Sequence, residues 1–180
     1  MAHETAAPTD GAYTGAKTAK QRLLERYEIN HAKTLNVLRA FPGAKSEFKP
    51  HERSNSALRL AWTFVVEERL LLKAVRGEEL LGGGSGFGSP PETWDAVLDL
   101  FNKGYDDVIA ALRDPSNPEL QGTVTFFSGP KQTADMPIEV FAVFMLDDQI
   151  HHRGQLSVYV RMAGGLVPAI YGPSADEPWF

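Results

Sequence analysis

Residues 136–163 read MPIEVFAVFMLDDQIHHRGQLSVYVRMA, and two glycines follow them. Apolar side chains recur in steps of three and four along this stretch, which predicts one long helix that the glycines end. One stripe of this helix is typical of a core, except that a carboxylate and an imidazole interrupt it near the middle, one turn apart. The members of the stripe are Phe141, Met145, Asp148, His152, Gln155 and Tyr159.

Three further segments show helical spacing of their apolar residues: 18–41, 56–75 and 91–113. Pro42 and Gly43 follow the first of them and predict its end. The segment 56–75 is apolar on more than one side, which predicts a helix packed against two neighbours. Four long helical patterns with little strand predict an all-α chain, folded as a four-helix bundle.

Two connections between these helices are unusual. The glycine-rich segment 77–89 lacks the Gly-Lys-Ser/Thr of a phosphate-binding loop, and no strand precedes it, so we interpret it as a linker. The segment 115–136 is long for a simple connection. Within it, residues 123–127 (TVTFF) have strand-like composition and predict a short extended piece or a hairpin.

The ends of the chain are predicted to lie outside the helices. Residues 1–17 are small and polar, which is typical of a flexible tail. Residues 166–180 contain three prolines and end on Trp179 and Phe180, so we expect an ordered coil that these two aromatic side chains anchor. Between them, residues 18–180 are predicted to form a single domain with this coil as its tail.

Composition narrows the function classes. The 180 residues are 43% hydrophobic and 23% charged, as in ordinary globular proteins. A net charge of -5 argues against nucleic acid as a partner. There is no cysteine, so any metal must be held by His, Asp, Glu or carbonyl groups. The apolar runs are shorter than the roughly 20 residues of a membrane span, and the start of the chain lacks signal-peptide character, which predicts a cytoplasmic protein without a membrane partner.

Asp148 and His152 have two interpretations. Buried without a partner, each would be costly, and a divalent metal is one partner that an i, i+4 pair can share. Alternatively, the two side chains pair with each other, the aspartate orienting a protonated histidine. The neighbouring Asp147 and His151 have the same spacing and are expected to form an exposed pair.

Two longer stretches resemble a known family. Residues 148–177, with HHRGQLSVYVRMAGGLVPAIYGPSADE as their main part, and residues 54–68 (SNSALRLAWTFVVEE) are similar to segments of the DinB/YfiT-like family of small bacterial proteins. The resemblance implies a bundle with long crossing connections and a homodimer. It also implies a divalent metal held by three histidines, one from the second helix and two, four residues apart, from the fourth. The apolar surplus of the segment 56–75 independently favours the homodimer.

Matched residue by residue, this chain departs from the family's metal site. Only His152 keeps the ligand type, while Asp148 and Thr63 stand where the family has its other histidines. Aspartate oxygen can still bind nickel, zinc, manganese or iron, but threonine is a poor ligand. The resemblance therefore implies an altered site that binds metal weakly, is empty, or is completed from elsewhere.

Two other residues are candidates to line or complete this pocket. His31 lies on the apolar stripe of the first helix, where its expected role is that of a core histidine with one hydrogen bond. Glu67 comes one turn after Thr63, and we expect it to face solvent. Arg153 is expected to anchor polar groups of the C-terminal tail such as Asp176.

Two functions remain open. The first is a metal-dependent enzyme, a transferase that uses a small thiol or a hydrolase, acting on a small molecule, as the resemblance implies. The second is a non-catalytic, metal-free relative that acts as a dimeric small-molecule-binding protein.

Overall fold

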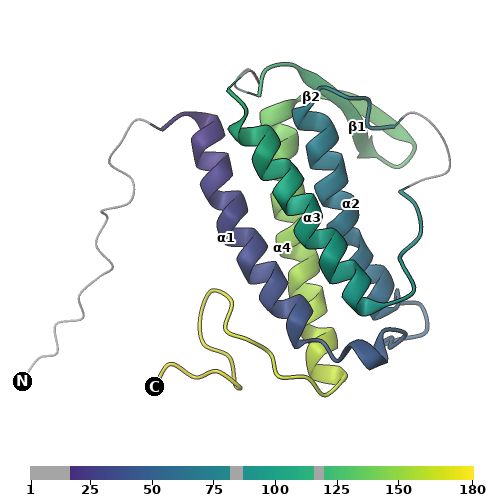
Figure 1. The fold of residues 1–180 in the computed structure, drawn as a ribbon. Helices are drawn as coiled ribbons and strands as arrows, with labels where there is room; N and C mark the ends of the chain where they lie inside the picture. Colours follow the sequence, from purple (N-terminus) through teal and green to yellow (C-terminus); the bar gives the residue numbers. More distant parts are fainter. Residues whose placement is uncertain (1–16, 82–86, 116–119) are drawn as a thin grey trace, which may run out of the picture.

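The computed structural model describes residues 17–81, 87–115 and 120–180, and consists mostly of four helices (Figure 1). The predicted tail 1–17 lies, except for Lys17, outside these residues, as does the centre of the glycine-rich linker. The elements are α1 (Ala19–Ala40), a short 3-10 turn η1 (Gly43–Lys45), α2 (Ala57–Val75), α3 (Trp94–Arg113), β1 (Thr123–Gly129), β2 (Gln132–Pro137) and α4 (Ile138–Met162).

Side-chain caps explain where the first three helices begin. The hydroxyls of Thr18, Ser56 and Thr93 each accept a hydrogen bond from a backbone N–H of the first turn. Because Thr93 is the cap, α3 begins at Trp94, three residues later than the sequence predicts. The indole N–H of Trp94 then donates to the Leu38 carbonyl oxygen at 3.0 Å, which fixes the start of α3 against α1.

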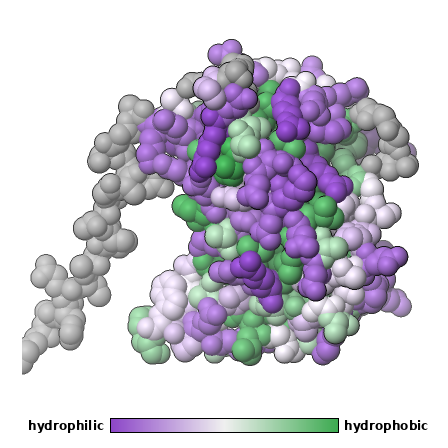
Figure 2. Space-filling view, viewed as in Figure 1, coloured by the Kyte–Doolittle hydropathy of each residue, from purple (hydrophilic) through white to green (hydrophobic). Residues whose placement is uncertain are grey.

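The helices enclose one core. Each of α1 and α2 contacts both α3 and α4 (Figure 1). The apolar residues of α2 are buried almost all round, and within this helix only Arg59 and Arg69 are exposed. The apolar surplus of α2 is thus absorbed inside one chain, so this part of the argument for a homodimer was wrong. The face in view over α1 and α3 is largely hydrophilic (Figure 2).

A two-stranded antiparallel hairpin precedes α4, so the chain is mostly helical rather than all-α. Val124 and Phe126 alternate inward along β1, and the Phe126 ring packs edge-on against Phe141 of α4 at 5.1 Å between centroids. The prediction of an extended piece or hairpin at residues 123–127 is confirmed. The hairpin leads directly into α4, whose Ile138 N–H donates to the Gly122 carbonyl oxygen.

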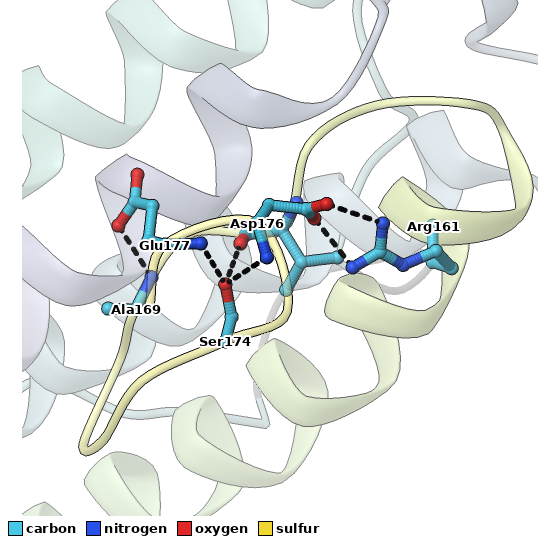
Figure 3. Close-up of polar contacts among 6 residues, drawn as sticks. Arg161, Ala169, Ser174, Asp176 and Glu177 are labelled. Carbon is cyan, nitrogen blue, oxygen red and sulfur yellow. Dashed lines mark hydrogen bonds and ion pairs between the residues drawn. The ribbon is translucent and has the colours of Figure 1, made fainter. Parts of the chain in front are cut away.

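The coil after α4 folds back along α1 and α4. It turns at Gly165, where a Cβ atom would lie 2.5 Å from the Ala40 carbonyl oxygen, so only glycine fits. Farther on, Asp176 accepts hydrogen bonds from Arg161 at 2.9 Å and from the Val167 N–H at 2.7 Å (Figure 3).

The expectation that aromatic side chains anchor the end of this coil was wrong. Trp179 and Phe180 are exposed, and polar contacts hold the coil instead. Ser174 and Glu177 add hydrogen bonds within the coil itself, Glu177 by accepting from the Ala169 N–H (Figure 3).

Among the helices of the described residues, none is both long enough and apolar enough to cross a membrane.

Candidate metal centre

Glu67 of α2 faces Asp148 and His152 of α4 near the middle of both helices. The Nδ1 atom of His152 lies 2.7 Å from Glu67 Oε1 and 3.8 Å from Asp148 Oδ1. One donor atom from each of the three side chains lies within 4.8 Å of the other two. Two carboxylates and an imidazole therefore converge on one point between α2 and α4.

Burial controls the electrostatics of this group. Glu67 is only 2% exposed, and burial raises the pKa of its carboxyl to about 8, although His152 opposes the shift. Burial lowers the pKa of His152, but the hydrogen bond and charge of Glu67, with the charge of Asp148, outweigh it and raise the pKa above its usual value. The Glu67–His152 pair therefore keeps a proton near neutral pH.

Neighbouring side chains fix these three residues in place. Asp148 and His152 share one face of α4 because they are four residues apart. The ring of Phe64, on the preceding turn of α2, packs edge-on to His152 at 6.3 Å. Glu68, the residue after Glu67 on α2, is fully buried and accepts a hydrogen bond from Gln149 of α4 at 3.2 Å. The two helices thus carry two adjacent polar contacts, and the one with His152 is nearer to solvent.

Glu67, not Thr63, is the α2 member of this cluster. Thr63 lies one turn earlier, is partly exposed, and donates its hydroxyl to the Arg59 carbonyl oxygen at 3.3 Å. The expectation that Glu67 faces solvent was wrong, because α2 packs against both α3 and α4 and buries this side as well. The signal was present in the sequence, since a helix that is apolar on several sides has little solvent-facing surface on which to place a glutamate.

His31 lies apart from the cluster, in the core. Its ring is buried, stacks on Tyr105 at 3.8 Å between centroids, and has Asn102 Oδ1 3.2 Å from its Nε2 atom. Burial lowers its pKa to about 4, although the hydrogen bond to the Asn102 side chain opposes the shift. The predicted core histidine with one hydrogen bond is confirmed.

Two other expectations need correction. Arg153 does reach the C-terminal coil, but through the Tyr171 hydroxyl, while Asp176 pairs with Arg161. Asp147 and His151 do not pair with each other as expected. Asp147 instead lies 3.8 Å from Arg26, and His151 contacts Gln155. The two side chains point along the helix surface to different neighbours.

The residues present fit a divalent metal ion. Glu67 Oε2 is buried and has no hydrogen-bond partner, and an unpartnered buried carboxylate oxygen is costly. A cation between the three side chains would give this oxygen a partner. Carboxylate oxygen and imidazole nitrogen are both common ligands of first-row divalent metals.

Comparison with known proteins agrees with this fold. The sequence profile of the DinB superfamily matches residues 26–156, more than half of the chain. The chain therefore belongs to the DinB superfamily. It is also 31% identical over 88 residues to the uncharacterized protein YrdA of Bacillus subtilis, a match that spans about half of each protein.

Two solved structures share the fold. A DinB-like protein from Bacillus cereus superposes with a TM-score of 0.68 at 22% identity, covering 83% of this chain and 95% of that one. The DinB-like protein YjoA from Bacillus subtilis superposes with a TM-score of 0.60 at 16% identity, covering 79% and 92%. At these identities the likeness concerns the fold alone.

Proposed function

We propose that this protein binds a divalent metal ion on Glu67, Asp148 and His152 and acts as a metal-dependent enzyme on a small molecule. The observation that carries the proposal is the buried carboxylate of Glu67, which faces two further donor side chains and has one oxygen without a partner. We further propose the transferase or hydrolase class, which the family resemblance implies.

The donor set supports a particular order of metals. Two carboxylates and one imidazole form a harder set of ligands than three histidines. Relative to a three-histidine site, this set favours manganese and iron over zinc and nickel. Zinc and nickel remain candidates, because the general order of affinities favours them at most nitrogen and oxygen sites.

The protein side chains have separate roles in this proposal. A bound ion would supply Lewis-acid chemistry, polarising water or a thiol. Glu67 orients the imidazole of His152 through the 2.7 Å contact at Nδ1. Asp148 is the most exposed of the three side chains, so a small molecule reaches the centre from its side.

Metal content tests this proposal. Protein purified without a nickel column is assayed by elemental analysis, and by thermal shift with manganese, iron, nickel and zinc. We expect a positive shift that is lost in Asp148→Asn and His152→Ala, because two ligands rarely hold a metal. Asp147→Asn is the matched control, since it removes the same charge one residue away. Equal binding by Asp148→Asn and Asp147→Asn would show that the cluster is not the site.

One observation favours the second candidate, a metal-free protein that binds a small molecule. The short contact between His152 Nδ1 and Glu67 Oε1 already gives each group a partner without any ion. Wild-type protein that contains no metal, and that none of the four ions stabilises, would favour this function over the enzyme.

A further inference from the structure

Two cationic side chains lie close together where α1, α4 and the C-terminal coil meet. Arg153 of α4 is only 1% exposed, and its Cζ atom lies 5.1 Å from the centre of the Tyr171 ring. Lys33 of α1 has its Nζ atom 4.1 Å from the centre of the same ring. The pKa of Lys33 is lowered, first by burial and second by the charge of Arg153. Two positive charges are thus held against one tyrosine.

These two cations lack a counterion. Among the described residues, no carboxylate forms an ion pair with Arg153 or Lys33, and both donate to neutral oxygens. The acidic residues of the coil have other partners, since Asp176 pairs with Arg161 and Glu177 accepts from a backbone N–H. A buried charge without a counterion is costly, so an anion bound here would be stabilised.

There is space for an anion beside Lys33. α1 and α4 run in the same direction (Figure 1), and Arg26 of α1 lies 3.8 Å from Asp147 of α4. Seven residues later on each helix, which is about two turns, Lys33 comes opposite Gly154. The cation of the first pair is thus repeated, but a glycine replaces the carboxylate. A Cβ atom at position 154 would meet nothing within 4 Å, so open space lies beside the helix at this point.

The backbone does not explain why position 154 is a glycine. Gly154 is exposed within α4, and it is not among the glycines with positive φ. An exposed glycine inside a helix destabilises it by about 1 kcal/mol relative to alanine. Glycine is also the residue that lets a ligand approach the backbone closely. An anion bound between Lys33 and α4 would account for it.

We propose that Lys33 and Arg153 form a binding site for a phosphate or carboxylate group of a small organic molecule. Both groups accept charge-assisted hydrogen bonds from guanidinium and ammonium donors. Tyr171 now covers Arg153 through its hydroxyl, and its side chain is 62% exposed. The anion therefore reaches Arg153 by displacing this hydroxyl, without separating the helices.

This anion site is distinct from the candidate metal centre. His152 contacts Glu67 of α2, whereas Arg153 contacts Thr34 of α1, because successive residues of a helix point about 100° apart. The two sites therefore lie on different sides of α4. Anion binding by protein that holds no metal would support this proposal and count against the proposed function alone.

An NMR titration of the ¹⁵N-labelled full chain tests the site. Inorganic phosphate and acetate are the two probes, with sodium chloride keeping the ionic strength constant. We expect saturable shifts of the backbone amides of residues 33, 154 and 171 with at least one probe, in the millimolar range. Saturation by phosphate alone would assign a phosphate group, and saturation by acetate alone a carboxylate. Shifts at these residues that are no larger than those with chloride alone would overturn the proposal.

Two pairs of variants locate the binding. Lys33→Gln should weaken it at least tenfold, whereas Lys49→Gln, the control, removes the same charge from an exposed loop position and should not. Gly154→Asp should abolish binding, because its carboxylate would lie opposite Lys33 as Asp147 lies opposite Arg26. Gly154→Ala adds a methyl group without a charge and should weaken binding less. Neither substitution at position 154 should unfold the chain, since a Cβ atom has space there. Equal affinity in Lys33→Gln and Lys49→Gln, or in Gly154→Asp and wild type, would refute the site.

Discussion

At the residue scale, His31 makes the stability of the protein depend on pH. Its pKa is about 4 in the folded protein because burial disfavours the charged ring, against 6.5 ordinarily. The unfolded chain therefore takes up a proton as the pH falls through 6.5, whereas the folded protein does so only near pH 4. This contribution to the free energy of unfolding is complete above pH 6.5 and is lost between 6.5 and 4, with a maximum of about 3 kcal/mol.

Replacing this histidine should remove that dependence. In His31→Gln the amide retains a polar contact for Asn102 but does not titrate, so stability should change less than in wild type between about pH 7 and about pH 4.5. Urea unfolding followed by tryptophan fluorescence measures the difference. His51→Gln serves as the control because His51 is exposed in the loop before α2. If stability depended on pH as steeply in His31→Gln as in wild type, His31 would not be the source of this dependence.

The residues of the centre could be predicted only in part. The spacing of Asp148 and His152 along one helix requires that they share a face, and the structure places them together. Glu67 was named as a candidate for this pocket, but its inward orientation was not predicted, because it depends on how α2 packs between α3 and α4. The contact between Glu67 and His152 joins residues 85 positions apart, and such pairings are a tertiary property.

At the scale of elements, helix positions followed from the sequence more closely than their partners did. The four predicted segments agree with the four helices to within three residues, since caps, prolines and glycines act locally. The sequence did not show which apolar faces of these helices remain exposed. The surplus on α2 is buried inside the chain, whereas α4 keeps exposed apolar side chains, because the packing of four helices determines which faces meet.

The face of α2 that carries Glu67 offers a way to strengthen the centre. Thr63 lies one turn earlier on this face and is only partly buried, so a histidine can replace it at the loss of one weak hydroxyl contact. Thr63→His should raise metal affinity at least tenfold, because it adds an imidazole beside two carboxylates and a histidine.

Titration against a metal chelator measures this gain. Thr63→Asn is the control, since it adds a polar side chain without an imidazole. Equal affinity in Thr63→His and Thr63→Asn would mean that position 63 lies too far from Asp148 and His152 to share a ligand with them.

At the scale of the whole molecule, the C-terminal coil joins the core through a buried cation. The guanidinium of Arg153 donates to Asn30 and Thr34 of α1 and to the Tyr171 hydroxyl of the coil. No carboxylate pairs with it among the described residues, so neutral oxygens alone solvate this charge. The sequence indicated that Arg153 holds the coil, but the partner depends on how the coil folds back.

Tyr171→Phe should therefore loosen the coil. The substitution keeps the ring that Lys33 contacts at 4.1 Å but removes the oxygen that accepts from Arg153 and donates to Asn30. Hydrogen bonds to charged groups contribute about 1.5–3 kcal/mol when buried, and water can replace part of this one, so we expect a loss of about 1 kcal/mol in urea unfolding. Hydrogen exchange of residues 166–177 should speed up severalfold.

In Tyr159→Phe, the control, a hydroxyl that donates to the Asn55 carbonyl is lost, and exchange in the coil should stay unchanged. If both variants left the coil equally protected, the Arg153–Tyr171 contact would not be what holds it.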